Sequence, residues 1–140
     1  GFMETFYLNV TEMDRIFFQG RCRQIQFTAS DGMYGVMPHH ENMVIAVYAG
    51  TLRIQKEDGQ WLEGVTGAGF LQIIHNRALM IVDTVERPED IDRQRAQDAY
   101  DRAREQLRQK NSMIEYELNK ANLARAMARL KMTSRYGDRK

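Results

Sequence analysis

The chain of 140 residues is poor in cysteine, proline and tryptophan, and it contains no long hydrophobic run. Its single cysteine, Cys22, cannot form an internal disulfide, so the fold does not rest on an oxidised framework and suits a reducing compartment. The most apolar run, residues 43–49, has the length of a strand, whereas a membrane helix needs about 18 apolar residues. We therefore expect no membrane insertion and no signal peptide, with Met3 as the native start.

Histidine is also scarce, and His39, His40 and His75 form no cluster with Cys22 at the spacing of metal ligands. Structural zinc is therefore not expected, and the chain is predicted to need no metal. A pairing of Cys22 with a histidine as nucleophile and base has no local support in the sequence. We expect no catalytic residues in this chain, and hence a role other than that of an enzyme.

Charge of neither sign dominates, because the formal net charge is only +1, and this argues against nucleic acid as a partner. The charge is nevertheless uneven along the chain. Residues 1–88 carry 7 Lys and Arg against 10 Asp and Glu, whereas residues 89–140 carry 13 against 9. Segments of opposite sign indicate two parts with different partners.

Residues 3–87 have the pattern of an all-β domain. Short runs rich in β-branched and aromatic residues lie at 6–10, 23–28, 43–49, 51–56, 61–65, 70–74 and 78–85. Turn residues such as Asp58-Gly59 separate them at intervals of about ten residues, which is typical of a sandwich or barrel. Gly67 and Gly69 suit either a bend in a strand or a phosphate cradle, and the bend is favoured because no P-loop lysine and no helix follows.

Pro88 marks a change from strand to helix patterns, since no proline follows it and helix-forming residues dominate. Apolar positions recur at helical spacing on two segments, first at Ala96, Ala99, Ala103 and Leu107, then at Leu123, Met127 and Leu130, with Ala121, Ala124 and Ala128 beside them. Residues 88–133 are therefore predicted to form an antiparallel α-helical hairpin. Its predicted elements are helices at 90–109 and 113–132, a turn at 110–112, and a frayed tail at 134–140.

Four arginines of the predicted hairpin are placed to bind an anion. Arg95 and Arg102 lie seven residues apart, ~10 Å along one helix face, and Asp92 can reach Arg95 from three residues before it. In the folded hairpin, Arg95 is expected to face the stretch between Arg125 and Arg129. Arginine does not lose its proton, so crowded guanidinium groups repel one another, and a polyphosphate would relieve that repulsion through bidentate hydrogen bonds. The alternative is an ordinary solvated helix face.

A series of short motifs runs through the chain: FFQG (17–20), SDGMYGVMPHHENMV (30–44), AGTLRI (49–54), GF (69–70), NRALMIVDTVE (76–86), IDRQRA (91–96) and LARAMARLKM (123–132). Their order and spacing, from Met3 to about Met132, resemble the epsilon subunit of bacterial F-type ATP synthase. The resemblance implies an N-terminal β-sandwich of about ten strands at 3–87, followed by a C-terminal antiparallel α-helical hairpin at 88–133.

The resemblance also implies a non-catalytic central-stalk subunit of a rotary ATP synthase driven by protons or sodium ions. The β domain would bind the gamma subunit on one side and the c-ring of the membrane sector on another. The hairpin would be compact against the sandwich, or extended along gamma toward the alpha and beta catalytic subunits, where it inhibits ATP hydrolysis. The implied location is the cytoplasmic face of the bacterial plasma membrane, as a peripheral protein.

The motif IDRQRA matches the [IL]DxxRA signature that marks ATP binding in some members of the family. Carried over by position, the implied ATP-binding residues are Glu86, Ile91, Asp92, Arg95, Ala96, Arg102, Arg125 and Arg129. Ile91 and Ala96 would flank the adenine, and the arginines would hold the triphosphate. Glu86 and Asp92 would accept from the adenine amino group or hold the arginines. ATP would be a regulatory ligand, since no Walker motif or hydrolytic base is present.

The resemblance places a subunit contact, expected to face the c-ring, after the second predicted strand. The implied contact residues are Asp31, Gly32, Met33, Tyr34 and His40. Met33 stands where an acidic residue is common in the family, which weakens a charge contact there, and Ala68 stands where glycine is usual. His40 has two interpretations, a subunit contact or a hydrogen-bonded structural histidine.

Three hypotheses follow for the whole chain. In the first, ATP binds the compact hairpin better than the extended one and so regulates a coupling subunit. When ATP falls, the hairpin opens and the basic residues of its second helix meet acidic surface on the catalytic subunits; these residues are Arg125, Arg129, Lys131 and Arg135. In the second, the chain is a purely mechanical coupler that never binds nucleotide. In the third, an unrelated β-sandwich ligand-binding protein self-associates through its hairpin, a role that the Ala-rich helix faces suit less well.

Overall fold

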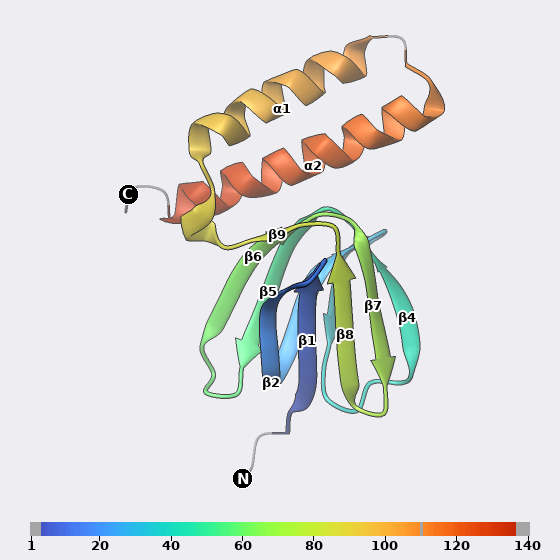
Figure 1. Ribbon diagram of the computed structural model, residues 1–140, viewed down its shortest axis with the longest axis vertical. Helices are drawn as coiled ribbons and strands as arrows, with labels where there is room; N and C mark the ends of the chain where they lie inside the picture. Colours follow the sequence, from blue (N-terminus) through green and yellow to red (C-terminus); the bar gives the residue numbers. More distant parts are fainter. Residues whose placement is uncertain (1–3, 110, 137–140) are drawn as a thin grey trace.

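A computed structural model describes residues 4–109 and 111–136, which form a β domain followed by a helical hairpin (Figure 1). Within these residues the strands are β1 (Phe6–Glu12), β2 (Arg15–Ala29), β3 (Gly32–Val36), β4 (Met43–Val47), β5 (Gly50–Lys56), β6 (Trp61–Thr66), β7 (Gly69–Ile74), β8 (Arg77–Val82) and β9 (Val85–Glu86). The helices are a 3-10 turn, η1 (Pro88–Asp90), and two α-helices, α1 (Arg93–Arg108) and α2 (Met113–Tyr136). The predicted order of a β-sandwich and then a helical hairpin is confirmed.

The strands form one continuous sheet that folds over itself into two layers (Figure 1). Their order is β4-β7-β8-β1-β2-β5-β6-β9, with β3 paired to β2. The long strand β2 belongs to both layers, because its first half pairs with β1 and its second half with β5 and β3. The pairing of β2 with β5 shifts register between Cys22 and Gln24, and a bulge of this kind bends a strand.

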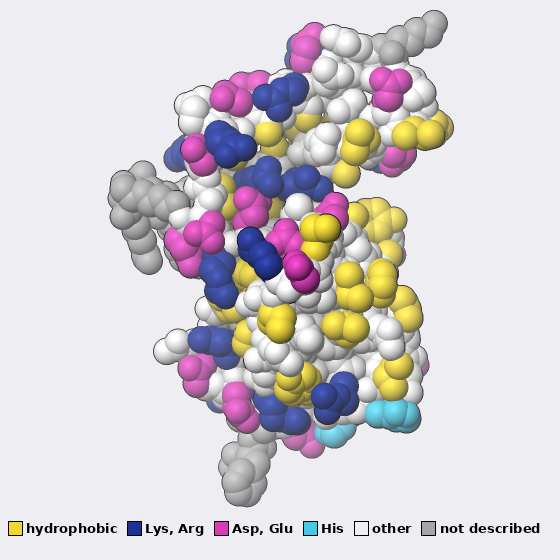
Figure 2. All heavy atoms as spheres, in the orientation of Figure 1, with side chains coloured by type: hydrophobic (Ala, Val, Ile, Leu, Met, Phe, Trp, Pro, Cys, Tyr) yellow, Lys and Arg dark blue, Asp and Glu magenta, His cyan; other side chains and the backbone are white. Residues whose placement is uncertain are grey.

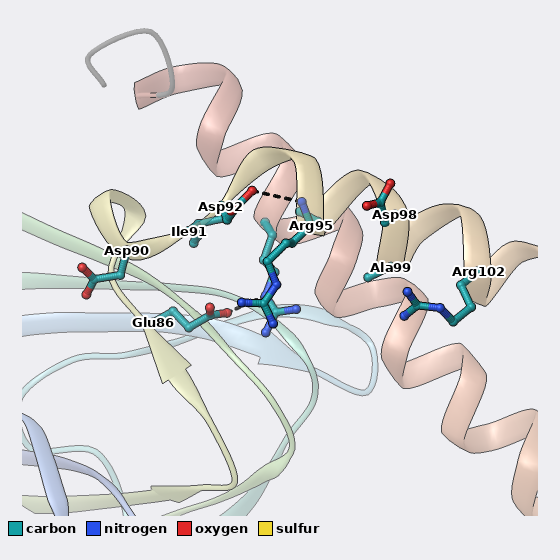
Figure 3. Close-up of a pocket in the computed structure, with 10 residues that line it drawn as sticks. Glu86, Asp90, Ile91, Asp92, Arg95, Asp98, Ala99 and Arg102 are labelled. Atoms are coloured by element: carbon teal, nitrogen blue, oxygen red, sulfur yellow. Dashed lines mark hydrogen bonds and ion pairs between the residues drawn. The ribbon is translucent and has the colours of Figure 1, made fainter.

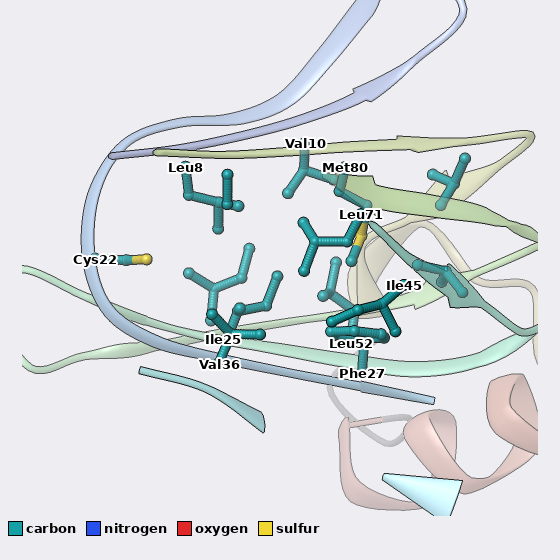
Figure 4. Packing of buried hydrophobic residues seen from close by; sticks show 14 of the residues in the cluster. Leu8, Val10, Cys22, Ile25, Phe27, Val36, Ile45, Leu52, Leu71 and Met80 are labelled. Carbon is teal, nitrogen blue, oxygen red and sulfur yellow. The ribbon is translucent and has the colours of Figure 1, made fainter. Parts of the chain in front are cut away.

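The two layers enclose a core of buried apolar side chains (Figure 4). Members from both layers are Leu8, Val10, Ile25, Phe27, Val36, Leu52, Leu71 and Met80. Side chains alternate between the two faces of each strand: on β7, Leu71 and Ile73 are buried, whereas Phe70 and Ile74 are exposed. The core therefore uses one face of each layer and leaves apolar residues on the outer face.

Two strand segments, the first part of β2 and the whole of β3, were not predicted from the sequence. β2 begins at Arg15, eight residues before the predicted run, because Arg15, Arg21 and Arg23 interrupt the apolar pattern there. β3 was missed because its sequence, GMYGV, contains two glycines, which are depleted in strands. Pairing with β2 overrides this weak local preference.

The predicted run 78–85 divides into β8 and β9 at Asp83 and Thr84. Before this corner β8 pairs with β7. After it the chain crosses to the other layer, where β9 pairs with β6. Hydrogen bonds of 2.9 Å fix the corner, from the Gly67 amide to the Thr84 carbonyl and from the Asp83 amide to the Ala68 carbonyl. Gly67 lies between β6 and β7 and Gly69 begins β7, and both glycines allow a close approach of the segment at residues 81–84.

The helices α1 and α2 lie antiparallel, with α2 nearer the β domain (Figure 1). Asp92 caps α1 by accepting from the Arg95 amide at 3.1 Å. Ser112 and Glu115 form a reciprocal capping box at the start of α2, with distances of 3.2 and 3.3 Å. These local signals explain why the helix starts lie close to the predicted ones.

Two expectations about α2 need correction. Met127 was expected on the apolar face but is 53% exposed, whereas its neighbour Ala126 is fully buried. The helix also continues to Tyr136 and is not frayed from residue 134. Arg135 donates to Glu63 of β6 at 2.9 Å, which anchors this last turn; the rest of the expected tail, 137–140, lies outside the described residues.

Candidate functional site

A cavity of about 370 Å³ lies where the chain leaves the β domain and enters the hairpin (Figure 3). Its lining residues are Glu86, Asp90, Ile91, Asp92, Arg95, Ala96, Asp98, Ala99, Arg102 and Arg129. Seven of the eight predicted ATP-binding residues are among them, and Arg125 is the exception. The cavity therefore joins residues from β9, the connecting turn and both helices.

The connecting segment places the first wall of this cavity. Glu86 ends β9, Pro88 begins the 3-10 turn, and Ile91 follows as a buried residue in extended conformation. Ile91 and Ala96 also pack in an apolar cluster with Val65, Ala128 and Met132, which joins the hairpin to the sheet. The two residues expected beside adenine thus form part of the contact between the domains as well as lining the cavity.

Asp92 has a different partner from the one expected. Its carboxylate accepts from the backbone amide of Arg95, so it caps the helix and does not pair with the Arg95 guanidinium group. No hydrogen bond or ion pair within the described residues engages the side chain of Arg95 or Arg102. Both side chains extend along the cavity side of α1 (Figure 3). The cavity thus holds two cations that have no protein partner in the described parts of the chain.

Glu86 and Arg129 form the closest ion pair of the site. The Arg129 Nε donates to Glu86 Oε1 at 2.5 Å, and both side chains are about one quarter exposed, at 25% and 28%. Because Glu86 lies at the end of β9 and Arg129 on α2, this pair links the sheet to the hairpin. The expectation that Glu86 would hold an arginine is met in this contact.

Arg125 lies in a neighbouring cavity of about 360 Å³ between the two helices. That cavity is lined by Ala99, Arg102, Ala103, Gln106, Asn119, Asn122, Arg125 and Arg129. Arg95 therefore shares a cavity with Arg129, whereas Arg125 lines the neighbouring cavity together with Arg129.

Four basic residues of α2 are predicted from the sequence to contact the catalytic subunits in the extended state. In the structure, carboxylates of the β domain form ion pairs with three of them. Arg125 pairs with Asp83 at 3.5 Å, Arg129 with Glu86, and Arg135 with Glu63. Asp83 and Glu63 were not predicted as partners, because no local pattern relates residues 42 and 72 positions apart. We call these three contacts the rim ion pairs.

The remaining arginines of α1 lie on its solvated side. Arg93, Arg104 and Arg108 are exposed, and Arg108 pairs with Glu105 at 3.8 Å. Asp98 and Asp101 accept hydrogen bonds from Gln94 and Gln97, one helical turn before them.

The predicted subunit-contact residues divide into two groups. Asp31, Gly32 and Met33 are exposed at the turn between β2 and β3. Tyr34 Oη and His40 Nε2 lie 3.1 Å apart, and His40 Nδ1 lies 2.9 Å from the Glu41 carbonyl. Since a carbonyl only accepts, Nδ1 carries a proton, and in the neutral imidazole Nε2 is the nitrogen that can accept from the tyrosine hydroxyl. Both ring nitrogens of His40 are thus hydrogen-bonded within the domain.

The described residues contain no helix long and apolar enough to span a membrane, and no group of three His, Cys, Asp or Glu side chains arranged to hold a metal ion. Cys22 is fully buried, and burial raises the pKa of its thiol from 9.0 to about 12, against a smaller lowering by Arg21. A thiol is a nucleophile only as thiolate, so this environment suits packing and not reactivity.

Two family descriptions together match nearly the whole chain. The family described as ATP synthase, Delta/Epsilon chain, beta-sandwich domain, matches residues 5–88. The one described as ATP synthase, Delta/Epsilon chain, long alpha-helix domain, matches residues 89–134.

Individual relatives agree with these families. The chain is 45% identical over 133 residues to the ATP synthase epsilon chain of Ruminiclostridium cellulolyticum, covering 95% of this chain and 98% of that one. It is 42% identical over 130 residues to the ATP synthase epsilon chain of Caldicellulosiruptor bescii, covering 93% and 94%.

Solved structures share the fold. A chain in the OSCP/F1/c-ring part of the Euglena gracilis mitochondrial ATP synthase aligns with a TM-score of 0.78 and 20% identity, covering 96% of this chain and 84% of that one. A chain in the central stalk/c-ring part of the Tetrahymena thermophila enzyme aligns with a TM-score of 0.64 and 9% identity, covering 95% and 99%. At such low identity these matches show the fold alone.

Proposed function

Because this chain belongs to the family of ATP synthase epsilon chains, we propose that it couples rotation between catalytic head and membrane ring as a central-stalk subunit. Its hairpin is held compact by bound ATP, and when extended it inhibits ATP hydrolysis by the alpha and beta subunits. The protein acts peripherally at the cytoplasmic face of a bacterial plasma membrane, in a synthase driven by protons or sodium ions. The chain itself carries out no catalytic step.

The observation that supports ATP binding most directly is a pair of guanidinium groups in the cavity of Figure 3 that have no partner among residues 4–109 and 111–136. Arg95 and Arg102 project there from one face of α1, and Arg129 approaches from α2. Planar guanidinium groups match phosphate oxygens, and a bound polyphosphate would offset the repulsion between them. Ile91 and Ala96 add apolar surface beside them, suited to the adenine ring.

Regulation follows from where the cavity lies. Its walls come from both helices and from the β domain, so the complete lining exists only while the hairpin is docked. A ligand that needs this lining binds the compact state better and shifts the equilibrium toward it. In the extended state the rim ion pairs are broken, and Arg125, Arg129 and Arg135 are released to meet acidic surface on the catalytic subunits.

The docking of gamma is assigned to the outer face of β4, β7 and β8. Val44, Phe70, Ile74 and Ile81 are exposed there, and Figure 2 shows hydrophobic side chains gathered over these strands. Phe70 and Ile81 are cross-strand partners, so their side chains form one surface. An apolar face of this kind is typical of a protein–protein contact.

The contact with the c-ring is assigned to the turn formed by Asp31, Gly32 and Met33, together with Tyr34 and His40. The first three residues are exposed, and Met33 offers an apolar contact where the family often has a charge. The hydrogen bonds of His40 hold the segment around residue 40 in place.

Calorimetric titration of the whole chain with ATP tests the nucleotide site. Saturable binding is expected for the wild type, with affinity at least tenfold lower for Arg95→Ala because a phosphate partner is lost. Arg93→Ala is the matched control, since Arg93 is an exposed arginine two residues away that lines neither cavity. Equal loss in both variants would indicate non-specific attraction to positive charge and contradict the site.

A purely mechanical coupler remains the competing function. The rim ion pairs and the apolar cluster hold the hairpin compact without nucleotide, which is what this alternative requires. Under it, millimolar ATP gives neither heat nor a thermal shift with the wild type. That result would remove the regulatory site and leave the stalk role intact.

A further inference from the structure

Glu63 of β6 lies between two arginines that reach the same carboxylate oxygen. Arg135, on the last turn of α2, donates to Glu63 Oε2 at 2.9 Å. Arg53 stands directly opposite Glu63 on β5, and its Nε lies 3.5 Å from the same oxygen. The first distance is that of a charge-assisted hydrogen bond, whereas the second is longer than one. The two guanidinium groups therefore compete for one acceptor.

Arg53 is held short of Glu63 by its other contacts. Its guanidinium group lies over the ring of Trp61, with 4.2 Å between Cζ and the ring centroid, and its Nη1 donates to Gln26 Oε1 at 3.3 Å. Its Nε is buried and makes no hydrogen bond within residues 4–109 and 111–136. A movement of about 0.6 Å would bring this N–H to an ordinary hydrogen-bond length from the carboxylate. Because a buried N–H without an acceptor costs free energy, Arg53 favours such a closure.

The surroundings of Glu63 make this second arginine important. The Glu63 side chain is only 7% exposed, and α2 packs on β5 and β6, the strands that carry Arg53 and Glu63. A buried carboxylate left without a cation is strongly destabilised. When the hairpin leaves the β domain, Arg135 leaves with it. Arg53 stays beside Glu63, since both belong to the same sheet.

We propose that Glu63 changes partner when the hairpin moves, with Arg135 holding it in the compact state and Arg53 after the hairpin has left. This rests on the mobile hairpin of the function proposed above. Arg53 lowers the cost of undocking, because Glu63 keeps a cation beside it. In the compact state the charge of Arg53 also repels Arg135 at their shared oxygen. Arg53 therefore favours release of the hairpin, whereas Arg135 opposes it.

This change of partner needs no nucleotide. Glu63, Arg53 and Arg135 line neither the cavity of Figure 3 nor the one between the helices. The three residues therefore act on the position of the hairpin separately from a ligand bound in either cavity. Their effect is measurable on the free chain.

Hydrogen exchange of the last turns of α2, measured on the full chain without nucleotide, tests the proposal. Arg53→Met removes the charge and keeps an apolar stem, and we expect hydrogen exchange about threefold slower than in the wild type. Arg135→Ala is expected to make it at least fivefold faster. Arg23→Met is the matched control and should leave the rate unchanged, because Arg23 on β2 donates to a backbone carbonyl in the β5–β6 turn and not to Glu63.

Glu63→Gln provides the second background, since it keeps the shape of the side chain and removes its charge. If both arginines act through the carboxylate, Arg53→Met slows hydrogen exchange in the otherwise wild-type chain and has no effect in Glu63→Gln. Unchanged or faster exchange in Arg53→Met, or equal slowing in both backgrounds, would overturn the change of partner while leaving the mobile hairpin standing. Exchange of α2 as slow as that of the core strand β1 in every variant would overturn the mobile hairpin, and this inference with it. Unchanged protection of β1 shows that a variant is folded.

Discussion

Glu63, on β6, accepts a hydrogen bond from Arg135 on the last turn of α2 at 2.9 Å, across 72 residues of sequence. The Glu63 side chain is only 7% exposed, and Arg53 also lies 3.5 Å from it. A buried carboxylate is stable only with such partners. Of the rim ion pairs, this one lies farthest from both cavities along α2, so it can hold the hairpin whether or not a ligand is bound.

We expect Arg135→Ala to weaken docking of the hairpin by about 1–3 kcal/mol, because Glu63 loses one charged partner in a buried setting. Hydrogen exchange of the last turns of α2 measures the effect as faster exchange. Lys131→Ala is the control, since Lys131 is exposed and lies on the same helix, one turn before. Equal exchange in the wild type and in Arg135→Ala would show that the pair does not fasten the helix.

Ala126 is fully buried on α2, whereas Met127 beside it is 53% exposed. We expect Ala126→Leu to cost about 1–3 kcal/mol of stability, because added methyl groups in a packed site force neighbouring atoms apart. Thermal unfolding followed by circular dichroism measures this change. Met127→Leu should leave the midpoint nearly unchanged, and a similar loss in both variants would contradict the assigned register.

Most of the fold was predictable because its signals are local. Short runs rich in β-branched and aromatic residues marked most of the strands, Pro88 marked the change of domain, and Ala spacing marked both helices. The predictions that failed concern segments whose structure depends on contacts with residues far away in the sequence. The glycine-bearing strand β3 forms through its pairing with β2, and the last turn of α2 is held by Glu63. Neither partner can be read from residues near the segment in question.

The sequence predicted most of the residues that line the candidate site, but it did not predict all the ion-pair partners of its arginines. Seven of eight residues line one cavity, since the IDRQRA signature and the seven-residue arginine spacing are local features of α1. The partners of Arg125 and Arg129 depend instead on how the helix meets the sheet rim, where Asp83 and Glu86 stand.

Asp92 both caps α1 and lines the cavity where the β domain meets the hairpin, and substitutions can separate the two roles. We expect Asp92→Ala to cost about 1 kcal/mol, and Asp92→Asn only a few tenths, because asparagine caps a helix as well as aspartate does. Chemical unfolding of both variants without nucleotide measures this difference. An equal loss for Asn and Ala would mean that the carboxylate charge, and not the cap hydrogen bond, stabilises the helix start.

Gly69 of β7 pairs with Val82 of β8, and the backbone of β8 lies close to its Cα. An alanine Cβ there would overlap the Ile81 carbonyl oxygen and lie 2.7 Å from Val82 Cα, both backbone atoms that cannot turn aside. We expect Gly69→Ala to cost about 3 kcal/mol, measured by urea unfolding. Gly35→Ala, whose nearest atom would be 4.0 Å away, is the control, and equal stability of the two variants would refute the close approach.

The buried thiol of Cys22 makes stability depend on alkaline pH. Its pKa is about 12 in the folded protein, against an ordinary value of 9.0 for an exposed thiol, so the unfolded state ionises first. The stabilisation is complete below the unfolded pKa and is lost as pH rises between the two values, by about 1.4 kcal/mol per unit. Unfolding free energies measured from pH 8 to 10.5 should therefore fall more steeply for the wild type than for Cys22→Ala, in which this group is absent. Parallel profiles, or rapid labelling of the native thiol at pH 8, would contradict the burial of Cys22.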